Sequence, residues 1–367
     1  MIAYNKNWLY NRYVRSQADE ALREQCIMPE MHEAIFKAKE IKFYTPNFFI
    51  RLGLALLTLV ITVFVSGLLA LMFSPSNSLI PFLLLFMGVA CYASAELLIH
   101  SKSHYNSGVD NMLVWMAALL LCIGFCWNVS SASNVQCIFS MVTFFVCSVL
   151  VLRFADTLLS IAAVTALLCF LFFCCQQAGT LAQTTTPFIM MLASFALYFV
   201  SAKAARAASL LLYRNCLVCA NIVALIALYG AGNYYFVREV SFEMPHYGGL
   251  RQADTLRIGW LYWAWTFLVP LIYIGIGIRV RNIILIRTGI PLIAVAVLTF
   301  RYYHSVIAPE LAMLLGGALL FIVSYSLINY LREPRDGFTF QPENYTADKP
   351  NIAGMVTNEF IDKAAGK

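Results

Sequence analysis

Long apolar runs separated by short polar turns occupy most of the chain from Phe48 to Leu331. A bilayer core about 30 Å thick needs roughly 20 apolar residues per helix. The runs lack the alternating polarity of transmembrane β-strands. The pattern therefore predicts an all-α, polytopic transmembrane helical bundle of about ten spans. The expected spans are 48–73, 79–99, 112–127, 135–152, 157–175, 188–202, 209–230, 258–278, 283–300 and 310–331.

The polar segments divide the chain further. Residues 1–47 are mixed in charge and predict two amphipathic helices, Lys6–Gln25 and Pro29–Phe43. They favour a cytosolic helical hairpin packed on itself or on the membrane surface, and the alternative is a docking platform for a partner. Residues 48–331 form the expected transmembrane domain, and 332–367 a largely extended cytosolic tail.

Composition supports the membrane class, because 12% of the residues are charged against about 25% in soluble domains. Of the 11 cysteines, all but Cys26 lie in apolar runs, where they act as small hydrophobes rather than as a disulfide framework. Cys122 with Cys126, and Cys216 with Cys219, share helix faces, which leaves metal or redox chemistry as the weaker alternative. No metal and no cofactor is predicted.

Basic residues predict the orientation, since Lys and Arg collect in cytoplasmic loops. They recur in alternate loops, at Lys102, Arg153, Lys203, Arg279 and Arg332 among others, whereas the loops near 74, 130 and 184 contain none. The exceptions on the outer side are Arg301 and the arginines of the 231–257 loop, which that loop's acidic residues offset: Arg238, Arg251 and Arg257 against Glu239, Glu243 and Asp254. Both termini are therefore expected in the cytosol. The membrane rule also explains these arginines without nucleic-acid binding.

The segment 231–257 is the largest predicted outer loop. Its aromatic residues fit an interfacial belt, and the alternation over Val237–Phe242 allows a short strand or an interfacial segment. This loop and residues 1–47 are the two surfaces expected to meet a protein partner, besides the lipid bilayer.

Glu96 is the acid placed well inside an apolar run, and intramembrane charges are functional candidates. Glu96, His100 and His104 are spaced i, i+4, i+8, so they share a face if the helix continues. A carboxylate with two imidazoles is a possible metal set. The favoured interpretation is a helix end in which Glu96 pairs with Lys102 or Lys203.

A second cluster surrounds the last outer turn and contains Arg301, His304 and Glu310 beside Tyr302 and Tyr303. An Arg301–Glu310 ion pair that staples the loop is favoured over a site for an anion or lipid headgroup.

Asn221 lies near the middle of the seventh span, where an amide usually makes an interhelical hydrogen bond. Pro270 and Pro291 interrupt the eighth and ninth spans. Broken helices of this kind mark some transporter sites, although kinks absorbed by packing are commoner.

Three strings carry a resemblance: CIMPEMHEAI (Cys26–Ile35), AELLIHSKSHYNSGVDNMLVW (Ala95–Trp115) and RYYHSVIAPELAMLLGGALL (Arg301–Leu320). With the layout of a short helical region before many spans, the chain resembles multi-spanning membrane proteins of Bacteroidetes-type bacteria. They are grouped as a domain-of-unknown-function family. The resemblance implies a bacterial protein of the inner membrane, and it implies no catalytic residue.

Catalytic motifs are also absent from the sequence: no P-loop, HExxH, GxSxG or dinucleotide fingerprint is found. The first hypothesis is therefore a non-enzymatic scaffold or accessory subunit of a membrane complex. The second is a transporter or lipid-handling protein with a polar midplane cavity lined by Asn221 or Glu96. The third is a membrane-embedded enzyme using Glu96, His100 and His104, or Arg301, His304 and Glu310.

Overall fold

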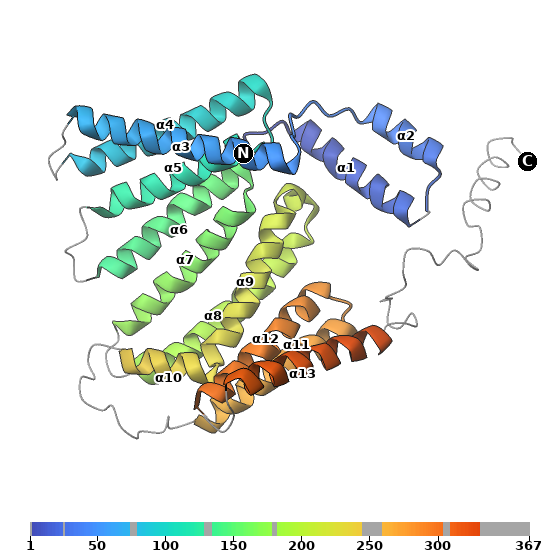
Figure 1. The fold of residues 1–367 in the computed structure, drawn as a ribbon, viewed down its shortest axis with the longest axis vertical. Helices are drawn as coiled ribbons and strands as arrows, with labels where there is room; N and C mark the ends of the chain where they lie inside the picture. Colours follow the sequence, from blue (N-terminus) through green and yellow to red (C-terminus); the bar gives the residue numbers. More distant parts are fainter. Residues whose placement is uncertain are drawn as a thin grey trace, which may run out of the picture. The chain divides into compact units, whose positions relative to one another are not determined.

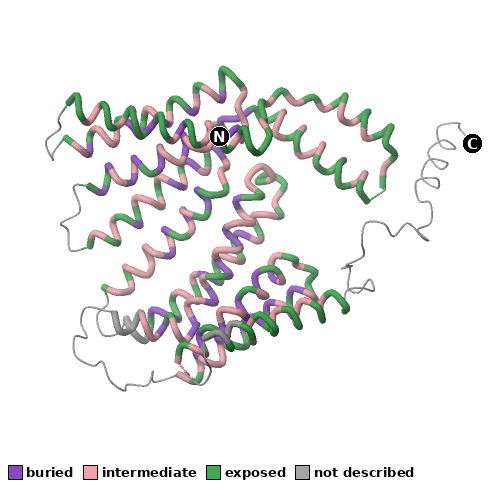
Figure 2. Tube along the Cα trace, in the orientation of Figure 1, coloured by how far each residue is buried: buried purple, intermediate pink, exposed green. Residues whose placement is uncertain are grey.

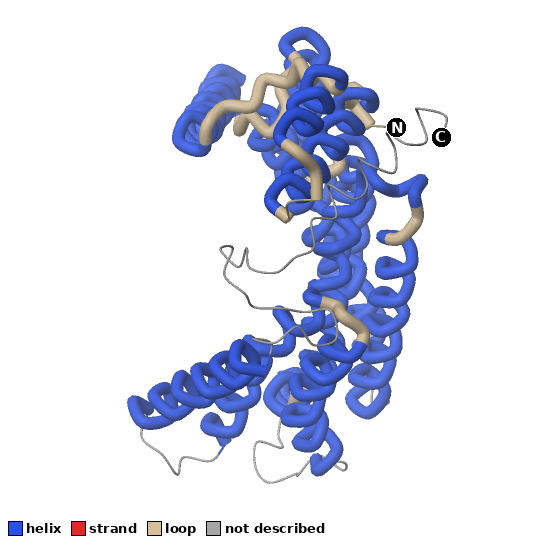
Figure 3. Tube along the Cα trace, turned by 90° about the vertical axis from the view of Figure 1, so that its right-hand side faces the viewer, coloured by secondary structure: helices blue, strands red, loops and turns tan. Residues whose placement is uncertain are grey.

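The structure is a computed structural model that describes residues 2–24, 26–73, 79–127, 134–177, 182–243, 259–303 and 309–330. Within these ranges the chain forms helices joined by loops and contains no strand (Figure 3). The helices are α1 (Lys6–Arg23), α2 (Pro29–Ala38), α3 (Phe48–Phe73), α4 (Ile80–Lys102), α5 (Val109–Cys126), α6 (Val135–Phe154), α7 (Thr157–Gln176), α8 (Ala182–Ala205), the 3-10 helix η3 (Ala208–Tyr213), α9 (Arg214–Gly232), α10 (Tyr234–Glu243), α11 (Gly259–Arg279), α12 (Ile283–Tyr303) and α13 (Pro309–Tyr330) (Figure 1).

The predicted all-α polytopic fold is confirmed. Nine helices in the described part of the chain are long and apolar enough to cross a membrane. The last helix, α13, adds the shorter apolar segment Gly316–Tyr330. The sixth span was predicted too short: α8 covers Ala182–Ala205, because the helix continues through the polar threonines before Pro187. The predicted tail, 332–367, lies outside the described residues.

Two further details of local structure differ from the expectations. Of the two alternatives for Val237–Phe242, the strand was wrong, because the segment belongs to helix α10; the interfacial position stays a prediction. Apolar residues at Tyr234 and Val237 also have helical spacing, so a short alternation did not decide between the two. The second predicted helix ends at Ala38 rather than Phe43, and an extended segment follows it.

The chain divides into two compact units. Of the described residues, those within 2–127 and 149–156 belong to unit 1, and those within 134–148 and 157–330 belong to unit 2. In unit 1, α4 packs closely along α5 because each helix has a glycine at the contact. A Cβ on Gly88 would lie 2.8 Å from Cγ of Leu121, and a Cβ on Gly124 would lie 2.9 Å from Cγ of Leu85. Small residues let transmembrane helices approach in this way.

Helix α3 of unit 1 is exposed along most of its length (Figure 2). Leu71 is 81% exposed, whereas Thr58 and Thr62 are buried. Both threonine hydroxyls donate to backbone carbonyls one turn earlier, at Leu54 and Thr58 respectively. This inverted arrangement, apolar outside and polar inside, is expected where lipid surrounds the helix.

The core of unit 2 joins α9, α11 and α12. Its buried members are Leu225, Leu228, Tyr229, Val269, Tyr273, Leu285 and Leu292. The Tyr273 hydroxyl donates to the backbone carbonyl of Leu225 over 3.0 Å, which ties α11 to α9. Helices α11 and α12 each continue through their proline, Pro270 and Pro291. The two predicted interruptions are therefore accommodated within single helices.

Candidate functional site

The most completely built polar site lies in unit 1 around Asp110, in the first turn of α5. Asp110 is fully buried. Its carboxylate accepts hydrogen bonds from the backbone N–H groups of Asn106 (2.8 Å) and Ser107 (2.9 Å) and from the Ser107 hydroxyl (3.0 Å). The fourth donor is the Tyr4 hydroxyl, at 3.1 Å. A buried carboxylate needs such partners, because burial without them is costly.

Tyr4 connects the N-terminus to this site from 106 positions away in the sequence. Its ring is buried and packs edge-on against Tyr105 and Phe43. Burial, and then the charge of Asp110, raise the pKa of the Tyr4 phenol well above its usual range. The phenol therefore remains a proton donor to the carboxylate at neutral pH. Next to it, the Ala3 amide donates to the carbonyl of Arg153 over 2.8 Å.

The helical hairpin α1–α2 continues from this anchored segment, and its two helices lie side by side (Figure 1). Arg15 of α1 donates to the carbonyl of Phe36 over 2.6 Å and lies over the Phe36 ring. His32 of α2 lies 2.8 Å from Asp19. Helix α2 has no buried residue, and Met31 is half exposed.

The loop between α4 and α5 has an unusual backbone that shapes the Asp110 site. Ser103, Asn106 and Gly108 all have positive φ, at 53°, 54° and 94°. A Cβ on Gly108 would lie 2.2 Å from the backbone oxygen of Arg51, so only glycine fits there. The Arg51 side chain in turn donates to Oδ1 of Asn106. The loop is thus held from α3 as well as from the N-terminus.

Glu96 forms an ion pair, but with a different partner from those predicted. Nε of Arg153 lies 2.5 Å from Oε1 of Glu96, and the Tyr92 hydroxyl donates to the same oxygen over 2.7 Å. The predicted pairing with Lys102 or Lys203 was wrong, because the carboxylate pairs with Arg153 in the last turn of α6. The next turn is also anchored, since the Trp115 indole donates to Asp156 over 3.2 Å.

The predicted set of Glu96, His100 and His104 does not share a helix face. Helix α4 ends at Lys102, and Ser103 is left-handed, so the chain turns before His104. His104 instead lies against Tyr44, and its Nδ1 is 2.8 Å from the Ser107 hydroxyl oxygen. His100 is exposed. Among the residues the structure describes, no group of three potential metal ligands occurs.

Asn221 of α9 is buried in unit 2 and accepts a hydrogen bond from the Ser201 hydroxyl of α8. This is the interhelical bond predicted for it. A second buried amide, Asn233, lies between α9 and α10 and donates to the hydroxyls of Tyr229 (2.9 Å) and Thr299 (3.2 Å). Both amides bond to neighbouring side chains, and neither lines the pocket beside α12.

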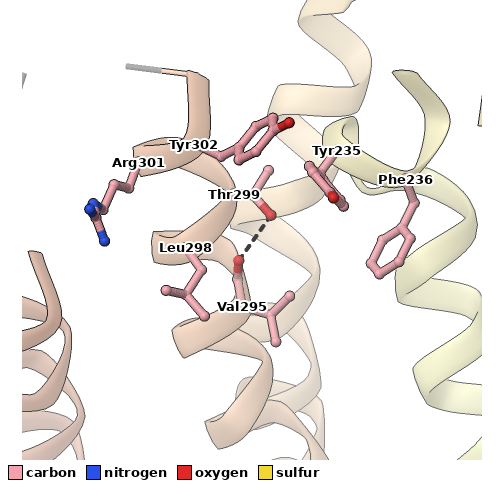
Figure 4. A pocket seen from close by; sticks show the side chains of 7 residues that line it. All are labelled: Tyr235, Phe236, Val295, Leu298, Thr299, Arg301 and Tyr302. Carbon is pink, nitrogen blue, oxygen red and sulfur yellow. Dashed lines mark hydrogen bonds between the residues drawn. The ribbon is translucent and has the colours of Figure 1, made fainter. Parts of the chain in front are cut away.

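That pocket has a volume of about 580 Å³ and lies beside the C-terminal part of α12. Its lining comes from α10 and α12 (Figure 4): Tyr235, Phe236, Val295, Leu298, Thr299, Arg301 and Tyr302. Tyr235 packs edge-on against Tyr302, at 4.9 Å between ring centroids. Arg301 extends from the side of α12 away from Phe236 (Figure 4). The pocket thus combines an apolar wall with a cation at its rim.

The neighbouring residues of the predicted Arg301 cluster have separate positions. Tyr303 points to α10, where its hydroxyl donates to Glu239 over 3.3 Å and its ring lies under Arg238 at 4.7 Å. His304 lies outside the described residues, as does the side chain of Glu310. The expected Arg301–Glu310 pair therefore stays a prediction.

Comparisons with family models, with curated proteins and with solved structures found no match to the chain. The class of protein follows from the structure itself. Its long apolar helices and their exposed apolar faces define a multi-pass integral membrane protein of the helical-bundle type.

Three residues of these polar contacts were not predicted as partners from the sequence: Asp110, Tyr4 and Arg153. Asp110 was assigned to the loop, because the third span was expected to start at Met112 instead of Val109. A signal was present: an acid two residues after the turn residues Asn-Ser-Gly, in the first turn of an apolar helix. Nothing local in the sequence pointed to Tyr4 or Arg153 as partners.

Proposed function

We propose that this chain is a non-enzymatic scaffold or accessory subunit of a complex in a bacterial inner membrane, with both termini in the cytosol. In this proposal the α1–α2 hairpin is the surface that receives a cytosolic protein partner. The resemblance of three sequence strings to multi-spanning proteins of Bacteroidetes-type bacteria supports the bacterial source. The asymmetry of Lys and Arg supports the orientation.

The observation that carries the proposal is the contact between Tyr4 and the buried Asp110. A hairpin that only covered the membrane surface would not need a buried carboxylate to hold the segment before α1. Here Tyr4 fixes that segment to the loop before α5, while α2 has no buried residue. A rigidly mounted, exposed helix loses little conformational entropy when a partner binds it.

The test is the mass of the protein extracted into native lipid nanodiscs. We expect a stoichiometric partner that is lost in Met31→Glu, which places a charge on the exposed apolar side chain of α2. Glu33→Gln, on the same helix and also exposed, is the matched control and should retain the partner. A lone monomer in the unsubstituted protein would contradict the scaffold function.

The orientation is tested separately with tags at each end. We expect both tags to be labelled only after the inner membrane is permeabilised. Labelling of a C-terminal tag from the periplasm contradicts the proposed topology.

The pocket beside α12 supports a second candidate, the handling of an anionic amphiphile such as a phospholipid. Val295, Leu298 and Phe236 offer an apolar wall, while Arg301 offers a cation to a headgroup. Native mass spectrometry with phosphatidylglycerol tests it. Arg301→Gln should lose a bound lipid that Arg287→Gln, at the other end of α12, retains. Equal lipid loss in both variants contradicts a specific site.

A further inference from the structure

Two cysteine side chains of unit 2 meet near helix ends. Sγ of Cys137 lies 3.2 Å from Sγ of Cys174, although the two residues are 37 positions apart in the chain. Cys137 is the third residue of α6, and Cys174 lies two residues before the last residue of α7. Cys137 is partly accessible and Cys174 is exposed, and both are free thiols in the structure.

We propose that Cys137 and Cys174 form a disulfide bond that joins the first turn of α6 to the last turn of α7. A disulfide has an S–S distance of about 2.05 Å. The two sulfur atoms therefore have to approach by roughly 1 Å, within reach of small side-chain rotations at helix ends. The two thiols are already in contact, since their sulfur atoms lie 3.2 Å apart.

The periplasm favours oxidation of this pair. That the pair faces the periplasm rests on the orientation proposed above. With both termini in the cytosol, α6 begins and α7 ends on the outer side of the membrane. Each cysteine lies two residues from its helix end, which is about 3 Å along the axis, so both are at the depth of the interface. Disulfides form and persist in the periplasm.

The oxidant is an exchangeable protein disulfide, the class that drives thiol oxidation outside the cytosol. The Cys137 thiolate attacks one of its sulfur atoms and forms a mixed disulfide, releasing the first thiol of the oxidant. The Cys174 thiolate then attacks the Cys137 sulfur and releases the second thiol. The two cysteines give up two protons and two electrons, and the oxidant is reduced from one disulfide to two thiols.

The neighbouring Cys175 provides a matched control. It is adjacent to Cys174 in the same helical turn, so its replacement changes the local thiol content equally. The proposed bond uses Cys174 and leaves Cys175 free. Serine at either position is nearly isosteric with cysteine, so the membrane fold is retained in all three variants.

The experiment counts thiols in whole cells. Cells are quenched with acid, the protein is unfolded in detergent, and free thiols are blocked with N-ethylmaleimide. After reduction, newly released thiols are labelled with a maleimide-linked polymer and counted from the gel shift. We expect two labelled thiols in the unsubstituted protein and in Cys175→Ser. We expect none in Cys137→Ser or Cys174→Ser.

An unsubstituted protein that releases no thiols overturns the disulfide. Release that persists in Cys137→Ser overturns the assignment to this pair. The tag assay of the C-terminus, run on the same cells, reports on the orientation independently. A reduced pair in a protein whose C-terminus is cytosolic refutes the disulfide and leaves the topology standing. Loss of the α2 partner, in turn, has no bearing on the thiol count.

Discussion

Replacing Tyr4 by Phe removes one hydroxyl from a contact with a buried charge and leaves the ring packing intact. Tyr4 is 7% exposed and Asp110 is 0% exposed, so solvent does not weaken the interaction. A hydrogen bond to a charged group contributes roughly 1.5–3 kcal/mol. A loss of about 2 kcal/mol corresponds to roughly a 30-fold shift toward the undocked N-terminus, at 1.36 kcal/mol per factor of ten.

Hydrogen exchange measures this shift directly, since the Ala3 amide is bonded to Arg153 only while the N-terminus is docked. We expect peptides covering residues 2–12 to exchange roughly 30-fold faster in Tyr4→Phe. Tyr10→Phe is the control, because Tyr10 lies in the same region and is 51% exposed. A difference between the two variants below about twofold, the scale of ordinary non-additivity, would refute the proposed role of the Tyr4 hydroxyl.

Three further predictions follow from the same unit. Gly108→Ala should lower the free energy of unfolding by more than about 2 kcal/mol, which is measured as a lower melting temperature of the purified protein. Gly53→Ala is the control, because a Cβ there meets nothing within 4 Å. Equal melting temperatures for the two variants would contradict this prediction. Arg153→Gln should lower the free energy of unfolding by about 1–3 kcal/mol, because it leaves the Glu96 carboxylate without its cation. In a double-mutant cycle of thermal unfolding, adding Glu96→Gln should restore part of that free energy. Because burial and Asp110 raise the pKa of Tyr4 above its ordinary value of 10.0, docking should be complete below pH 10 and be lost as pH rises through the higher pKa of the docked state; exchange in residues 2–12 that is independent of alkaline pH, after correction for the intrinsic rate, would contradict it.

The sequence predicted the helices far better than the contacts between them. Apolar runs set the positions of the spans because each run has to match the bilayer thickness by itself. The amide of Asn221 was also predictable, since a buried amide in a helix has to find a partner on a neighbour. In both cases the physical requirement is local to one segment.

The polar partners of unit 1 were not predictable in this way. Glu96 was expected to pair with Lys102, six positions away, or with Lys203, but its partner is Arg153, which lies 57 positions along the chain. The metal set that included His104 failed because one left-handed residue, Ser103, ends the helix. A change of direction at a single residue separates side chains that a continuous helix would align.

A lipid environment explains why these few polar contacts matter so much. Lipid tails are as apolar as a protein core, so the hydrophobic effect does not select which face of a transmembrane helix turns inward. In α3 the inward face contains Thr58 and Thr62, while the outward face is leucine and phenylalanine. The contact of α4 with α5 likewise depends on Gly88 and Gly124. The N-terminal segment follows the same rule, because a tyrosine bonded to a buried carboxylate, in addition to its ring packing, determines where that segment docks.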